Sequence, residues 1–240
     1  MPHFHIFIIS WSGFHDSALN IAASFSEAKC KITIVYSDSN PDFSLKANVN
    51  SILRPNALYW ADKFKACIDF FDEEIMLIIH ADCKCEDWMS LFQQCQLAMK
   101  SKIIGAWAPK IKNTPWHINK TKLGLLTINK NKLRITAQTD AIIFALSLPV
   151  IERMREFNYD NNTYGWGIDQ AFIAYLYAHS LIAVVDESVE VEHNEVCGYA
   201  GDKQIAKKQM IEFLKQMTLP ESIQHLMLNA TIKLKSTRKI

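Results

Sequence analysis

The residues best suited to chemistry form an aromatic and glycine turn, Tyr164-Gly165-Trp166-Gly167-Ile168-Asp169-Gln170, in which two of the chain's seven glycines flank Trp166. Because glycine permits close approaches and unusual backbone angles, the triplet can press the indole against a bound ring while the chain turns. Asp169 would follow in the first turn of an apolar helix, where a carboxylate facing a pocket can accept a proton from a substrate hydroxyl. The alternative is that Trp166 fills a core and Asp169 caps the helix.

A polar pair at the end of an apolar run is the second such feature. Residues 75–79 read as a central strand that leads directly into His80-Ala81-Asp82. Because side chains alternate along a strand, His80 and Asp82 share one face. An imidazole and a carboxylate on one face can together hold a divalent cation or a ribose. The pair therefore predicts a ligand position at the exit of this strand.

Asp38 and His193 also stand at the ends of predicted strands. Asp38 follows the β-rich run 30–36 and opens a polar turn, although an aspartate that only caps a turn gives the same pattern. His193 ends the alternating run Glu190-Val191-Glu192-His193 and follows two acidic sites along the chain. Since ligands collect at the carboxyl ends of parallel strands, both residues are candidates for binding.

The stretches between these residues predict alternating strands and helices. Strands are expected at residues 3–9, 30–36, 74–79, 102–108, 123–128, 133–136, 140–146, 180–185 and 190–193. Helices are expected near residues 15–25, 57–71, 88–99, 150–155 and 168–179. A strand, a helix, a second strand and a polar loop are how a parallel sheet opens, so the predicted fold class is α/β.

Composition narrows the function. With 240 residues, 49% of them hydrophobic, the chain can bury a sizeable core, and a net charge of +1 argues against nucleic acid as a partner. The six cysteines show no Cys-x-x-Cys spacing, which favours reduced thiols. No signal peptide is evident, and no segment approaches the roughly 20 apolar residues of a membrane span. A cytoplasmic location is expected.

In their order along the chain, from Asp38 to His193, the motifs resemble those of GT-A fold glycosyltransferases. The acidic loop with Asp38 and the strand ending in His80-Ala81-Asp82 are similar to the inverting family 2 enzymes, and Gly165-Trp166-Gly167-Ile168-Asp169 is similar to the Gly-Trp-Gly-acidic motif of galactosyltransferases. The resemblance covers about residues 3–200. It implies one Rossmann-like GT-A domain over residues 1–202, with a mixed, mostly parallel sheet between helices, followed by a basic helical extension over residues 203–240.

The resemblance implies transfer of a hexose from a nucleotide-diphosphate sugar to a hydroxyl of a glycan or lipid-linked acceptor, with inversion and with Mn²⁺ or Mg²⁺. Such a reaction belongs to polysaccharide biosynthesis. The implied roles are donor binding by Asp38, His80 and Asp82, metal binding by Asp82 and His193, catalysis as the base by Asp169, and acceptor binding by Gly165, Trp166 and Gly167.

Two other classes are alternatives. Because His80 stands where the family usually has an aspartate, the chain could be a catalytically degenerate module that binds a nucleotide sugar or a glycan. A nucleotidyltransferase needs a Gly-rich, Arg-containing phosphate loop after the first strand, which Trp11-Ser12-Gly13-Phe14-His15 lacks.

The C-terminal residues 203–240 carry eight basic residues and two glutamates, with apolar positions at helical spacing. One interpretation is a basic amphipathic helix that contacts an anionic membrane peripherally. The other is a solvated helix pair that closes the domain.

Overall fold

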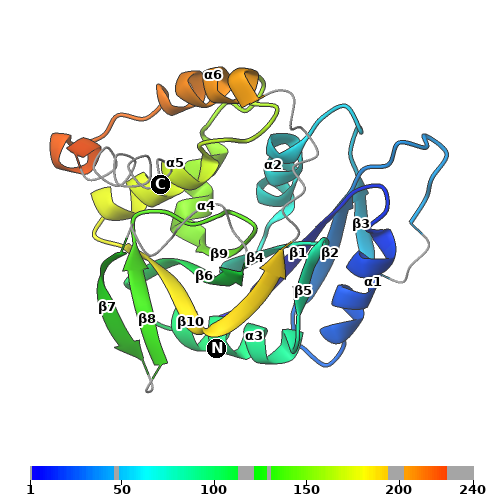
Figure 1. Ribbon diagram of the computed structural model, residues 1–240, viewed down its shortest axis with the longest axis horizontal. Coiled ribbons are helices and arrows are strands. Elements are labelled where there is room, and N and C mark those ends of the chain that lie inside the picture. Colours follow the sequence, from blue (N-terminus) through cyan, green and yellow to red (C-terminus); the bar gives the residue numbers. More distant parts are fainter. Residues whose placement is uncertain (1, 46–48, 113–121, 129–130, 194–202, 226–240) are drawn as a thin grey trace.

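The computed structural model describes residues 2–45, 49–112, 122–128, 131–193 and 203–225 of the chain (Figure 1). These residues form a sheet with helices packed on both faces, which confirms the predicted α/β class. No helix in these ranges is long and apolar enough to cross a membrane.

The sheet contains ten strands in the order β3-β2-β1-β4-β9-β6-β10-β8-β7, with β5 paired to β10. Its N-terminal half is parallel, since β1 pairs in parallel with β2 and β4, and β2 with β3. The other half is mixed: β9 runs antiparallel to β4 and β6, while β10 is parallel to β6. The strands are β1 (Phe4–Ser10), β2 (Lys31–Tyr36), β3 (Asn50–Leu53), β4 (Ile75–His80), β5 (Cys83–Cys85), β6 (Ile104–Lys112), β7 (Lys122–Ile128), β8 (Asn131–Thr136), β9 (Ile143–Ser147) and β10 (Ile182–His193).

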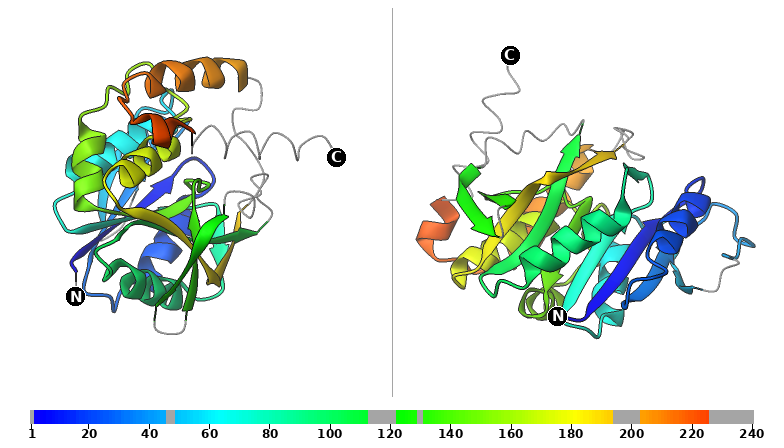
Figure 2. Two further views of the ribbon diagram at one scale, coloured as in Figure 1. Left: turned by 90° about the vertical axis from the view of Figure 1, so that its left-hand side faces the viewer. Right: turned by 90° about the horizontal axis from the view of Figure 1, so that it is seen from below.

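Two helix layers cover this sheet. One face carries α1 (His15–Ser24) and α3 (Trp88–Met99); the other carries α2 (Trp60–Phe70), α4 (Leu148–Arg155) and α5 (Ile168–Ala178) (Figures 1 and 2). The apolar side chains of β1 alternate between the two faces of the sheet, so both faces must be covered by helices. Ile6 and Ile8 belong to the core under α1 and α3, whereas Phe7 and Ile9 belong to the core under α2, α4 and α5.

A sixth helix, α6 (Lys203–Leu214), lies outside the second layer (Figure 2, left). Its residue Phe213 is buried and packs its ring 5.2 Å from that of Phe157 and 5.4 Å from that of Tyr159. Ala206 is also fully buried. Residues 203–214 are therefore part of the packed domain. The basic residues after position 225, which belong to the predicted helical extension, lie outside the described residues.

The structure differs from the predicted elements in several places. Strand β6 continues to Lys112, beyond the predicted end at 108, and β9 begins at Ile143 and not at 140. Strands β3 and β5 were not predicted, because β3 has an exposed four-residue pattern and β5 has only three residues. The two runs 180–185 and 190–193 form one strand, β10, which continues through a register shift between Asp186 and Glu190. Helix α2 begins at Trp60 and not at residue 57.

Candidate active site

Three strands bring His80, Asp82 and His193 together. His80 ends β4, Asp82 follows it, and β5 then pairs antiparallel with β10 so that Cys83 lies opposite His193. The ligand atoms of the three side chains lie within 4.8 Å of one another. The Nε2 atom of His193 is 3.0 Å from Oδ2 of Asp82. The sheet thus assembles two imidazoles and one carboxylate from residues that are distant in sequence.

The ligand atoms of these three side chains are available to bind a cation. Oδ1 of Asp82 and Nε2 of His80 are buried and have no hydrogen-bond partner among the described residues, which is costly for polar atoms unless a ligand satisfies them. Burial, the largest cause, lowers the pKa of His80 to about 4, so its imidazole is neutral at pH 7 and keeps a lone pair for a metal. Carboxylate oxygen suits Mn²⁺, and imidazole nitrogen is a common ligand of divalent transition metals. These residues therefore fit a divalent cation.

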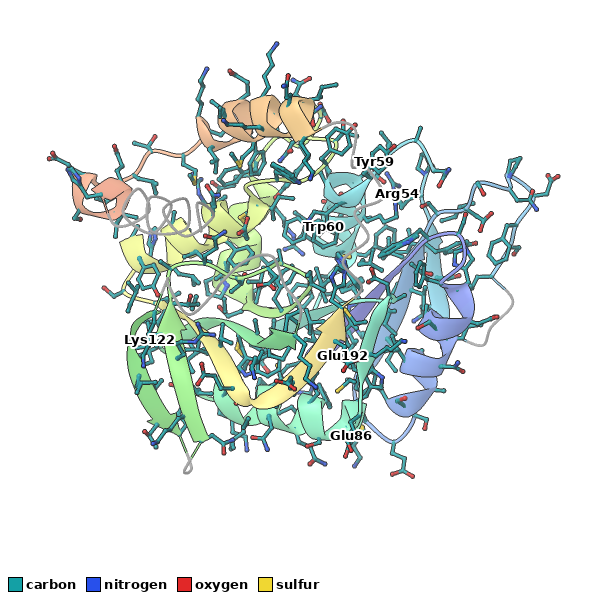
Figure 3. The ribbon with its side chains drawn as sticks, in the orientation of Figure 1. Arg54, Tyr59, Trp60, Glu86, Lys122 and Glu192 are labelled. Atoms are coloured by element: carbon teal, nitrogen blue, oxygen red, sulfur yellow. The ribbon has the colours of Figure 1, made fainter. Side chains whose placement is uncertain are left out.

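Two indoles enclose the His80 ring. The ring centroid of Trp60 lies 4.8 Å from that of His80, and that of Trp11 lies 5.8 Å away on a nearly perpendicular plane. Trp11 follows β1 and Trp60 begins α2; Figure 3 labels Trp60 there and Glu192 near the end of β10. These aromatic neighbours supply much of the apolar environment that keeps His80 uncharged.

The Gly165-Trp166-Gly167 turn precedes α5 and has left-handed φ angles at both glycines, +71° at Gly165 and +89° at Gly167. A Cβ atom at Gly165 would overlap Cδ1 of Trp60, and one at Gly167 would lie 2.9 Å from Cγ of Met210 on α6. The glycines therefore let α2 and α6 pack closely against the turn. The sequence predicts the backbone freedom of these glycines, but it does not predict that Trp60 and Met210 pack against them.

Asp169 lies in the first turn of α5, as predicted, and is partly buried. Loss of hydration on burial is the largest influence and raises the pKa of its carboxyl group to about 6. The N-cap residue of α5 is Gly167, which has no side chain to cap the helix, so Asp169 is not the helix N-cap. A carboxylate with a raised pKa binds a proton more tightly than an ordinary aspartate, which suits a general base.

Asp38 lies at the carboxyl end of β2, where it was expected. Its Oδ2 atom is 2.7 Å from Nε2 of His15, and its Oδ1 atom accepts a 2.6 Å hydrogen bond from the backbone N–H of Asn40. The Asn40 bond, followed by those to His15 and Ser12, lowers the pKa of Asp38. His15 was read only as the start of a helix, and no local pattern in the sequence pointed to this partner.

The known proteins similar to this chain are found through structure. No protein-family model matches the sequence, and no curated protein matches it. A mannosyltransferase from Pyrobaculum calidifontis, solved with GDP-Man and Mn²⁺, is 11% identical, with 99% of this chain and 75% of that chain covered and a TM-score of 0.62.

Two further solved structures give the same result. Glucosyl-3-phosphoglycerate synthase from Mycobacterium tuberculosis, with Mn²⁺, UDP and phosphoglyceric acid, is 10% identical over 92% of this chain and 80% of that chain, with a TM-score of 0.60. Residues 1–349 of S. aureus TarS, with UDP-GlcNAc, are 11% identical over 98% of this chain and 73% of that chain, with a TM-score of 0.64. The chain has the GT-A fold of these nucleotide-sugar glycosyltransferases, which confirms the predicted fold.

Proposed function

We propose that this protein is a metal-dependent glycosyltransferase that moves a hexose from a nucleotide-diphosphate sugar to a hydroxyl of a glycan or lipid-linked acceptor. The observation that carries the proposal is the His80, Asp82 and His193 group at the carboxyl edge of a GT-A sheet. That edge is where open α/β sheets bind their ligands. Buried ligand atoms that have no partner among the described residues support a cation at this position.

The three residues would hold Mn²⁺ or Mg²⁺, which offsets the negative charge on a leaving diphosphate when bound. Asp38 accepts hydrogen bonds from Asn40, His15 and Ser12, which leaves about one of its four acceptor positions, and it would use that position to bind the nucleoside. Asp169 would take the proton of the acceptor hydroxyl as it attacks the anomeric carbon, and Trp166 would pack against the acceptor. One base and one displacement give inversion, as in family 2.

The test is a panel of nucleotide sugars incubated with the purified protein and Mn²⁺, scored for donor hydrolysis and transfer. We expect turnover of at least one donor, loss of turnover in EDTA, and an inverted anomeric configuration in the product read by NMR. Binding of a nucleotide sugar without any turnover would favour the degenerate binding module. A retained configuration would exclude a single displacement with Asp169 as base.

We also propose that the basic segment that follows the 1–202 domain, of which the structure describes residues 203–225, contacts an anionic membrane from the cytoplasmic side. Support comes from the outward face of α6, where Ile205 is 51% exposed and Ile211 is 48% exposed. Exposed lysines at positions 203, 207, 208 and 215 flank these two residues. Apolar side chains among lysines suit the surface of an anionic bilayer.

A further inference from the structure

We infer that Trp60 is a positioning residue that couples the cation site to the Gly165-Trp166-Gly167 turn. The inference rests on the proposed function, because it takes His80 as a cation ligand. It adds that one indole fixes the position of the cation site, which would bind the leaving diphosphate, relative to the turn that would bind the acceptor. Neither the motifs nor the solved neighbours assign a role to Trp60.

The first contact is with the cation site. The Trp60 and His80 rings lie 4.8 Å apart at an interplanar angle of 65°, so the indole limits rotation of the imidazole. Nε2 of His80 has no hydrogen-bond partner among the described residues, and packing therefore fixes its ring more than hydrogen bonding does. Residues that orient a metal ligand typically change metal affinity about 10- to 100-fold when they are altered.

The second contact is with the turn. Cδ1 of Trp60 occupies the space that a side chain at Gly165 would need. The backbone N–H of Ala61 donates to the carbonyl of Thr163 over 3.4 Å. The rings of Tyr59 and Tyr164 stack with centroids 5.0 Å apart. The N-cap of α2, Tyr59, and the first two residues of that helix therefore contact Thr163, Tyr164 and Gly165 at the start of the turn.

The ring of Trp60 also packs against two buried phenylalanine rings. Its ring lies 5.6 Å from that of Phe64 and 6.3 Å from that of Phe144, both fully buried. The indole therefore cannot shift into the core to absorb a movement of the turn, because protein interiors are close-packed. The inference is that a displacement at Gly165 passes through the indole to His80.

The two glycines of the turn provide a matched test. Gly165→Ala and Gly167→Ala both place a Cβ at a left-handed φ, but the first meets Trp60 and the second meets Met210 and Leu214 of α6. Mn²⁺ affinity is measured by the EPR signal of free Mn²⁺ during titration, without donor or acceptor. We expect Gly165→Ala to weaken Mn²⁺ binding about tenfold, and Gly167→Ala to leave it within about twofold of the wild type.

A double-mutant cycle shows whether the effect passes through the indole. Trp60→Ala should weaken Mn²⁺ binding about 10-fold or more, and adding Gly165→Ala to it should have no further effect. Unchanged Mn²⁺ affinity in Gly165→Ala, an equal loss in Gly167→Ala, or the same effect of Gly165→Ala with and without Trp60 would each overturn the inference.

Two results keep its failure separate from that of the proposed function. If the wild type binds Mn²⁺ and only the pattern among variants is wrong, the coupling fails and the cation site stands. If the wild type binds no Mn²⁺, both fail. Should Gly165→Ala not fold, as judged by circular dichroism, Trp60→Leu replaces it; Mn²⁺ affinity equal to that of the wild type would then refute the coupling.

Discussion

The His15 ring joins Ser10 to Asp38. Its Nε2 atom lies 2.7 Å from Oδ2 of Asp38, and its Nδ1 atom lies 2.8 Å from Oγ of the fully buried Ser10. Because a carboxylate only accepts hydrogen bonds, Nε2 carries the proton and donates it. The ring of Phe43 stacks on His15 at 4.4 Å. Asp38 is therefore held in one orientation by this chain of contacts.

Replacing His15 should weaken nucleotide binding through Asp38. His15→Phe keeps the stacking with Phe43 but loses both hydrogen bonds, and we expect the Kd for the donor's nucleoside diphosphate to rise about tenfold, as for a lost hydrogen bond to a charged group. Isothermal titration calorimetry measures this change. His179→Phe, on the exposed end of α5, is the control. An unchanged Kd in His15→Phe would leave Asp38 with a structural role only.

Asp82→Asn should remove cation binding. The amide keeps the shape of the side chain but lacks the charge and the basicity that bind a divalent ion, so Mn²⁺ affinity should fall about 100-fold or more. The matched control is Glu192→Gln, which removes an exposed carboxylate beside His193 whose nearest cation is Lys112 at 3.5 Å. Equal losses in the two variants would point to general electrostatics and not to a cation site.

Asp169→Asn should separate catalysis from donor binding. Since asparagine cannot take a proton, the transfer rate should fall about 100- to 10,000-fold, while the donor Kd stays within about twofold. In the wild type, with a pKa of about 6, the rate should decline as pH falls through 6, because the base becomes protonated. Residual activity in the variant should not show this decline. Full activity in Asp169→Asn would exclude it as the base.

Asp169→Asn should also stabilise the protein against unfolding at neutral pH. The raised pKa means that the folded state binds a proton more tightly than the unfolded state, so stability decreases as pH rises from 3.8 to about 6 and stays lowered above it. Because the carboxylate is only partly buried, Asp169→Asn should add about 1 kcal/mol at pH 7 and little at pH 3.5. Thermal melts at both pH values test this, and a variant less stable at pH 7 would contradict it.

Phe213→Ala should destabilise the domain although it lies on the outermost helix. The ring is 3% exposed and packs on Phe157 and Tyr159, so its loss should cost about 3 kcal/mol in chemical denaturation. Ile211→Ala on the same helix, at a position 48% exposed, should cost less than about 1 kcal/mol. Similar values for the two would mean that α6 is not part of the cooperative unit.

The proposed membrane contact is tested by liposome flotation. We expect binding to vesicles that contain anionic lipid and none to neutral vesicles, with Lys207→Glu plus Lys208→Glu abolishing it, because each lysine near the surface contributes about 1 kcal/mol. Binding that does not depend on anionic lipid would leave α6 as a packing element alone.

Local patterns predicted the end of β4 well. The run 75–79 identified β4, and alternation placed His80 and Asp82 on one face, since both features depend only on neighbours in sequence. The position of His193 beside Asp82 depends on the pairing of β5 with β10, and a three-residue strand has too little pattern to be seen. The predicted roles of Asp38 and Asp169 remain predictions.

Contacts between distant side chains could not be predicted at all. The pairs His15 with Asp38 and Trp60 with Gly165 depend on how α1 and α2 pack against loops from other parts of the chain. Each residue has an ordinary local explanation: His15 begins a helix, and Gly165 allows a turn. Only tertiary packing reveals their partners.

The packing of α6 against Gly167 also affects how the protein folds while the ribosome makes it. The ribosome makes the Gly165-Trp166-Gly167 turn before it makes residues 203–214, so the nascent chain must wait for Met210 and Leu214 before this turn is covered. Until then Phe157 and Tyr159 lack the ring of Phe213 and expose apolar surface. The packing around this turn is therefore completed only after residues 203–214 have been made, and the apolar surface exposed until then is where a chaperone would bind the nascent chain.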